Sequence, residues 1–252
     1  MTTPLMNSII KIHIKRLGVF RVLIGAIAMY TTIPVFLLIH FVVITLISRL
    51  VIFPLLQINN INQRNFIIVD RYRVAGLGLI DTLNCLFCGW ANGLCLFLNR
   101  VIDVISVYQK KTGFLAKLVL TVIAALYLLP SMVISLVMNV LNNYFIAWSQ
   151  RFEKTYWLNI FKALKNDPEF APSYDGVARL YLVYLKTTWV SLSQSLEKIE
   201  SAWCPLKYLE RKEGAVYPQH HKIFFEPHQV RELHEYLIEY GTVLDKREDA
   251  PS

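Results

Sequence analysis

The sequence predicts an all-α integral membrane protein, with about three hydrophobic helical segments and an α-helical soluble domain at its carboxy end. Of its 252 residues, 55% are hydrophobic and 17% are charged, whereas an ordinary soluble domain carries roughly 25% charged residues. Three long stretches contain at most one charge. The excess positive charge lies in the apolar half, since residues 1–150 hold 12 Lys and Arg against 3 Asp and Glu, and residues 151–252 hold 14 against 15.

Residues 1–21 form a short tail in which every charge is positive: Lys11, Lys15, Arg16 and Arg21. The tail lacks the small-residue cleavage site of a secretory signal. Here and around the later apolar runs, basic residues flank the hydrophobic sequence instead of lining one face. That placement is typical of contacts with anionic lipid headgroups. It predicts a lipid bilayer as a partner and argues against nucleic acid.

The predicted membrane domain covers residues 22–150, with hydrophobic segments at about 22–48, 74–98 and 118–148. A spanning helix needs about 20 apolar residues. Pro34 and Pro130 divide the first and third segments, and proline in such a segment can kink a span or mark the tip of a hairpin. Spans and hairpins therefore remain two open models. Basic residues are evenly shared among the flanks, so they leave the orientation undetermined.

Residues 151–244 are predicted to form the helical soluble domain, which we expect in the cytoplasm. A long helix is expected at about 177–202 and a last helix at 227–240, which begins with proline in its first turn. A short strand is expected at 222–225. Residues 245–252 should be a disordered tail.

The second hydrophobic segment carries small and polar residues along one face. Lipid chains do not drive apolar helices together, so membrane helices associate through small residues and polar contacts. The pattern therefore predicts a helix-packing seam against the other hydrophobic segments. Its members are Asp81, Cys85, Cys88, Gly89, Asn92, Gly93, Cys95 and Asn99.

A metal or redox centre is the alternative reading of these cysteines. Cys85 and Cys88 lie one helical turn apart and could reach one ion. Cys95 lies ten residues beyond Cys85, about 15 Å along a helix, and cannot share a zinc ion whose sulfur ligands lie about 2.3 Å away. We therefore predict no metal and no cofactor.

Asp81 is the only charge in the second segment. A carboxylate in hydrocarbon costs about 2.5 to 3.5 kcal/mol, which makes a functional role the default hypothesis. His40 would be its partner in an intramembrane polar site if the first and second segments adjoin. The alternative places Asp81 near the interface, eight residues after Arg73, where water hydrates it.

The sequence contains no signature of an enzyme: GxSxG, HExxH and a phosphate-binding glycine loop are all missing. The sequence DRY at 70–72 matches a receptor motif, but there are too few spans for that family, so we treat the match as chance. His220, His221, His228 and His234 lie near one another in the sequence. Their spacing imposes no zinc geometry, and we expect surface histidines.

The stretch RELHEYLIEYG near the carboxy end resembles the glutamate-rich carboxy-terminal signals of bacterial effectors injected by type IV secretion. A solvated helix face accounts for the same glutamates. The resemblance covers a dozen residues.

The predicted function is non-enzymatic: a membrane anchor, assembly factor or adaptor that recruits a protein partner through its carboxy-terminal domain or forms a homo-oligomer. One alternative is a small channel or transporter subunit that uses Asp81 as part of a polar path. The resemblance above implies another alternative, a secreted bacterial effector that inserts into host membranes.

Overall fold

A computed structural model describes residues 9–59, 61–108, 176–209 and 213–239, together with isolated residues between 113 and 166. These residues form helices and no strand, apart from an isolated bridge between Leu206 and Phe225. The all-α prediction is therefore confirmed for the described part of the chain. Almost all of the third hydrophobic segment, the predicted boundary at residue 150 and the tail 245–252 lie outside it.

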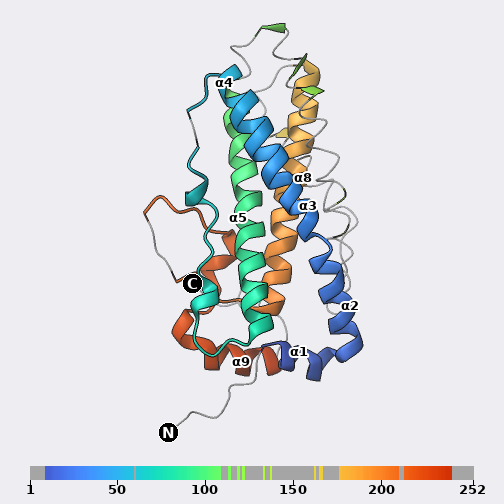
Figure 1. The fold of residues 1–252 in the computed structure, drawn as a ribbon, viewed down its shortest axis with the longest axis vertical. Helices are drawn as coiled ribbons and strands as arrows, with labels where there is room; N and C mark the ends of the chain where they lie inside the picture. Colours follow the sequence, from blue (N-terminus) through green and yellow to red (C-terminus); the bar gives the residue numbers. More distant parts are fainter. Residues whose placement is uncertain are drawn as a thin grey trace.

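The amino-terminal region is a short helix followed by a long bent rod (Figure 1). Helix α1 (Ile9–Leu17) ends at Gly18, whose φ of 86° turns the chain into the rod. Glycine adopts this left-handed conformation without steric cost. The rod contains α2 (Val19–Tyr30), α3 (Ile33–Leu38), the π-helix η1 (Ile39–Ile52) and α4 (Phe53–Leu55).

Pro34 does not reverse the chain within this rod. It lies in the first turn of α3, where a missing N–H is tolerated because the first amides of a helix have no acceptor within it. Figure 1 shows the chain continuing in the same general direction after this point. The proline therefore bends the first hydrophobic segment at the junction of α2 and α3.

Two long antiparallel helices form the centre of the fold. A loop with two short 3-10 helices, η2 (Gln63–Asn65) and η3 (Arg71–Arg73), leads to the 30-residue helix α5 (Leu79–Tyr108). Helix α8 (Gly176–Trp203) lies beside α5 (Figure 1). The predicted helix at 177–202 is confirmed, and it packs along the second hydrophobic segment.

The base of the bundle contains the last elements. The 3-10 helices η6 (Gln219–Lys222) and η7 (Pro227–Gln229) precede α9 (Val230–Glu239). Figure 1 shows α1 and α9 lying across the ends of the long helices. The last predicted helix is thus confirmed as η7 followed by α9.

The predicted strand at 222–225 is wrong. The amide of Phe225 bonds to Pro205 O at 2.7 Å, and the amide of Lys207 bonds to Phe225 O at 2.7 Å. The next amide, that of Glu226, instead bonds to the side chain of Gln229 at 2.9 Å. The backbone directly after the bridge therefore caps η7, and strand pairing ends after one residue.

Two apolar clusters hold these elements together. The larger one joins the bent rod, α5 and α8, with Phe36, Phe97 and Trp189 among its fully buried side chains. The smaller one joins α1 and α9 at the base through residues such as Ile12 and Leu233. Within the described residues, two helical segments are long and apolar enough to cross a membrane: Val19–Leu55 and Leu79–Val107.

Candidate functional site

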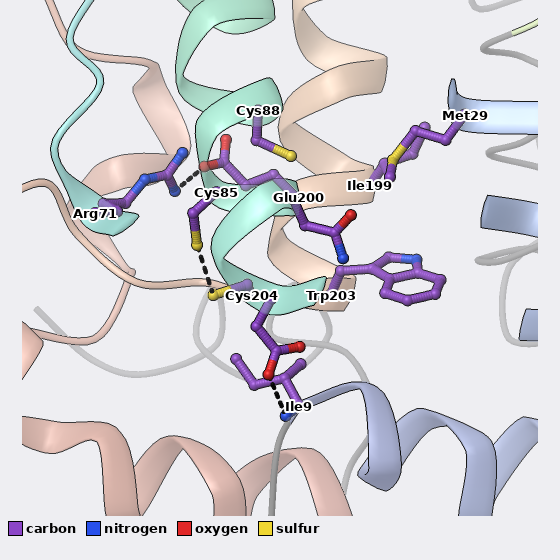
Figure 2. A pocket seen from close by; sticks show the side chains of 11 residues that line it. Ile9, Met29, Arg71, Cys85, Cys88, Ile199, Glu200, Trp203 and Cys204 are labelled. Atoms are coloured by element: carbon purple, nitrogen blue, oxygen red, sulfur yellow. Dashed lines mark hydrogen bonds and ion pairs between the residues drawn. The ribbon is translucent and has the colours of Figure 1, made fainter. Parts of the chain in front are cut away.

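A cluster of buried polar side chains lies where α5 begins and α8 ends, which we call the polar junction. Its centre is an ion pair between Arg71, from η3, and Glu200, from the last turns of α8 (Figure 2). Each side chain is 1% exposed. The polar junction consists of Arg71, Asp81, Cys85, Cys88, Asn92, Glu200, Cys204 and Tyr208.

Several further contacts surround the buried ion pair. Arg71 donates a hydrogen bond to the backbone oxygen of Leu206 at 3.1 Å, and its guanidinium lies 4.3 Å from the centre of the Tyr208 ring. Glu200 accepts a hydrogen bond from the side-chain amide of Asn92 on α5. Because a buried charge without a partner is very costly, these contacts tie η3, α5 and α8 into one arrangement.

Tyr208 continues the cluster toward the carboxy-terminal region. Burial raises the pKa of Tyr208 to about 12, although the Arg71 guanidinium acts in the opposite direction. Its ring stacks on His221, with the ring centres 4.4 Å apart. His221 and His234 are 6% and 7% exposed, so the expectation of surface histidines is wrong for these two. They lie inside because they pack against neighbouring elements, which sequence spacing does not reveal.

Asp81 binds the beginning of α1. Its carboxylate accepts hydrogen bonds from the backbone amides of Ile9 and Ile10, at 3.1 and 3.0 Å, and from Gly78 at 3.2 Å. A negative charge at a helix amino terminus is stabilising because the first amides there lack acceptors within the helix. Asp81 is only 3% exposed. It therefore acts as a cap that fixes α1 to the start of α5.

A second contact fixes α1 to the end of α8. The Nε2 atom of His13 lies 3.3 Å from the backbone oxygen of Trp203, and the two ring centres are 4.5 Å apart. Burial lowers the pKa of His13 to about 4. His13 is therefore neutral at pH 7 and packs as part of the base.

His40 and Asp81, the predicted intramembrane pair, have separate partners. His40 Nδ1 accepts a hydrogen bond from Trp90 Nε1 at 3.1 Å, and His40 Nε2 lies 3.2 Å from the amide nitrogen of Gln63. The first and second hydrophobic segments do adjoin, as expected. The contact at His40, however, is made by Trp90, nine residues beyond Asp81.

The cysteines near the junction are free thiols. The sulfur atoms of Cys85 and Cys204 lie 3.9 Å apart, and Cys88 lies nearby in the same wall (Figure 2). The hydrogen bond to Cys85 and burial both raise the pKa of the Cys204 thiol well above its ordinary value. Within the described ranges, no three His, Cys, Asp or Glu side chains are arranged to hold a metal ion. The Cys204 thiol is therefore protonated at pH 7, and a protonated, buried thiol is a poor nucleophile.

The junction lines a cavity of about 20 Å³. A single water molecule needs roughly 10 to 15 Å³ by the same measure, so the cavity has room for one water. Its lining residues are Ile9, Met29, Arg71, Asp81, Asn84, Cys85, Cys88, Ile199, Glu200, Trp203 and Cys204.

The predicted seam lies in the interior, although with partners that differ from those expected. Asn92 and Cys95 are buried, and Cys88 and Asn99 are half-buried. At Gly89 and Gly93 the neighbour is an extended part of the chain: a Cβ at Gly89 would lie 2.8 Å from Ile68 O, and one at Gly93 would lie 2.5 Å from Phe66 O. The two glycines therefore permit close approach of a loop to α5.

Sequence reasoning missed the two charged residues at the centre of the junction. Arg71 belongs to the sequence DRY at 70–72, whose match to a receptor motif gave no sign of a buried ion pair. Glu200 lies on a face of α8 rich in buried serines, such as Ser193 and Ser201. Two glutamates one turn apart, Glu197 and Glu200, on a helix with many small polar residues were the available signal. The partner of Glu200 is 129 positions away in the sequence.

Comparison with known proteins yields no match among family models, curated proteins or solved structures. The function is therefore argued from the geometry of the described residues.

Proposed function

We propose that this protein is a non-enzymatic membrane anchor that holds its carboxy-terminal helices at a bilayer surface, where they recruit a partner protein. The observation that carries the proposal is the exposed apolar face of the rod Val19–Leu55. In the most apolar part of this 37-residue segment only 33% of the residues are buried. The exposed apolar side chains among the others would face water in a soluble protein.

The exposed side chains on this rod are large. Phe20 is 73% exposed, Leu23 53% and Ile27 56%. Transferring such a side chain out of water stabilises by roughly 1.5 to 3 kcal/mol. A contiguous apolar surface of this kind marks a membrane or protein interaction site, and the length of the rod favours a bilayer.

Positive charges lie next to the apolar face. Lys11, Lys15, Arg16 and Arg21 are all exposed, on or just after α1. The sequence contains no acidic residue before Asp70. Anionic headgroups attract basic residues at a membrane surface by about 1 kcal/mol each. This arrangement supports insertion of the rod with α1 at the headgroup level.

The contacts at the base and in the polar junction would attach the carboxy-terminal helices to the anchored rod. Asp81 and His13 attach α1 to α5 and α8, and the Arg71–Glu200 pair attaches α8 to α5. Helix α9 exposes Arg231, Glu235 and Ile238, which makes it the candidate contact for a partner. We place this face in the cytoplasm.

The use of Asp81 favours anchoring over transport. Three backbone amides already occupy its carboxylate. A carboxylate in that position supports a helix terminus. The channel alternative instead needs Asp81 open to an ion or proton path.

Membrane extraction tests the anchor. The full chain is expected to remain in the pellet after alkaline carbonate washing. A variant with Phe20→Ser, Leu23→Ser and Ile27→Ser should move to the supernatant, while the control Ile238→Ser on α9 should not. A wild-type protein that stays in solution without membranes or detergent would refute the proposal.

Photo-crosslinking in native membranes tests the adaptor role. A crosslinker at Glu235 on α9 should give one defined adduct, and one at Leu46 on the rod should give lipid adducts only. Equal protein adducts at both positions, or none at Glu235, would contradict recruitment through α9.

A further inference from the structure

A second, larger cavity lies on the rod, away from the polar junction. Its volume is about 430 Å³, and it opens between η1 and the loop that follows α4. This cavity is more open to the surroundings than the small one at the junction. Its lining residues are His40, Arg49, Ile61, Asn62, Gln63, Arg64 and Ile67.

The charges in this cavity are of one sign. Arg49 and Arg64 contribute two guanidinium groups, and none of the described lining residues is acidic. Arg49 donates from Nη2 to the neutral side-chain oxygen of Gln63 at 2.7 Å. Its Nε is buried and has no hydrogen-bond partner among the described residues. A neutral amide thus orients the Arg49 guanidinium without cancelling its charge.

The loop side of the cavity is held by local hydrogen bonds. The backbone amide of Arg64 donates to the side chain of Asn62 at 3.1 Å, which shapes the short helix η2. Gln63, from the same turn, accepts from Arg49, and its amide nitrogen lies 3.2 Å from His40 Nε2. The Arg64 side chain is exposed at the rim. Two guanidinium groups around an open, polar cavity suit a phosphate group, because their planar N–H donors bind its oxygens in pairs.

The helix that lines one side of the cavity, η1, also exposes large apolar side chains. Phe41 and Leu50 follow His40 and Arg49 directly in the sequence, and they are 63% and 66% exposed. A water-soluble phosphate compound has no long hydrocarbon chain that could cover these apolar side chains. The acyl chains of a phospholipid would cover them.

We propose that this cavity binds the phosphate of an anionic phospholipid, with Arg49 and Arg64 as its ligands and the acyl chains lying over Phe41 and Leu50. The inference rests on the proposed membrane insertion of the rod. It adds a defined headgroup site to the general attraction between basic residues and anionic lipids.

Native mass spectrometry of the full chain, released from nanodiscs with equal amounts of dioleoyl phosphatidylglycerol and dioleoyl phosphatidylcholine, tests the site. The wild-type protein should retain phosphatidylglycerol about tenfold over phosphatidylcholine, and Arg49→Gln and Arg64→Gln should each reduce that preference by about fivefold to tenfold. Arg231→Gln, on the distant helix α9, is the matched control and should leave it unchanged. Because Arg64 is exposed, its variant keeps the test valid even if Arg49→Gln disturbs folding.

Three outcomes would overturn the proposal: equal retention of the two lipids by the wild type, an unchanged preference in Arg64→Gln, or complete displacement of phosphatidylglycerol by millimolar inorganic phosphate. The last would assign the cavity to a soluble phosphate compound. Carbonate extraction of both arginine variants separates this inference from the anchor itself. They should remain in the membrane, and release of the wild type would refute the anchor and not only the site.

Discussion

The two segments with the length and apolarity of membrane spans use that apolarity in different ways. The most apolar part of Val19–Leu55 is 33% buried, and that of Leu79–Val107 is 67% buried. The first segment shows large apolar side chains to its surroundings, whereas the second turns a face of small and polar residues inward. Similar hydropathy thus leaves an exposed apolar surface on one helix, which we propose that lipid covers, and forms the interior of the protein in the other.

Because of this difference, the side chains of the two segments need different surroundings. Apolar side chains on the rod need only a hydrocarbon environment. The polar groups of α5 need particular acceptors and donors, because an unpaired polar group in the interior costs about 1 to 3 kcal/mol. Substitutions should therefore act on the fold in α5 and α8, and on membrane partition in the rod.

The largest effect is expected for Glu200→Ala. It leaves the Arg71 guanidinium buried without its partner, which should lower the free energy of unfolding by about 3 to 5 kcal/mol. Denaturant titration in detergent measures the change. The control is Glu235→Ala, whose ion pair with Arg231 is exposed and should contribute less than about 1 kcal/mol. Equal losses in the two variants would contradict a special role for the junction.

A comparison of leucines in the two segments should give the next largest effect. Leu94 on α5 is fully buried and Leu23 on the rod is 53% exposed. Leu94→Ser should lower the free energy of unfolding by about 3 kcal/mol or more, whereas Leu23→Ser should change it by less than about 0.5 kcal/mol. The measurement is thermal unfolding in one detergent. Similar losses would mean that the rod face is part of a protein core.

Gly93→Ala should destabilise by about 1 to 3 kcal/mol. The added Cβ would lie 2.5 Å from Phe66 O and 2.6 Å from Ile67 Cα. Both are backbone atoms, which can move away only if the loop itself shifts. Gly113→Ala is the matched control, because a Cβ there meets no atom of the described residues within 4 Å. Thermal unfolding of both variants checks this. A neutral Gly93→Ala would show that the loop at 66–69 does not pack against α5.

Acidification should loosen the base of the bundle. The pKa of His13 is lowered from 6.5 to about 4 in the folded protein, so the unfolded chain binds the proton more tightly. The neutral imidazole therefore contributes stability above pH 6.5, and that stability is lost as the pH falls toward 4. The loss should reach about 2 kcal/mol at pH 5.

Denaturant titrations at pH 7.5 and pH 5, repeated with His13→Gln, isolate the contribution of this histidine. The variant should show a smaller difference between the two pH values by that amount. An unchanged difference would assign the pH dependence to other groups, among them His234, whose pKa burial also lowers.

Local patterns made several elements predictable. Helix α8 was expected within one residue of its bounds, and the last helix was recognised from its initial proline. Both depend on periodicity and on capping residues within a few positions. The strand expected at 222–225 failed because its pairing partner lies elsewhere in the chain and supplies only one bridge.

The candidate sites were only partly predictable for the same reason. Spacing placed Asp81, Gly89, Asn92 and Gly93 on one side of a helix. It could not show that Asp81 caps α1 or that a loop covers the glycines. Arg71 and Glu200 gained their importance only when η3 and α8 came together.

The sequence by itself determined that the chain is helical, that its first segment is apolar enough for a bilayer, and that α5 has a small and polar face. These properties arise from neighbours in the chain, through helix periodicity and side-chain solvation. Only the tertiary structure decided which buried charge meets which, and which apolar face stays exposed. Both depend on contacts between residues that are distant in the sequence. Such contacts supply the hydrogen bonds of buried polar groups and the side chains that cover apolar surfaces.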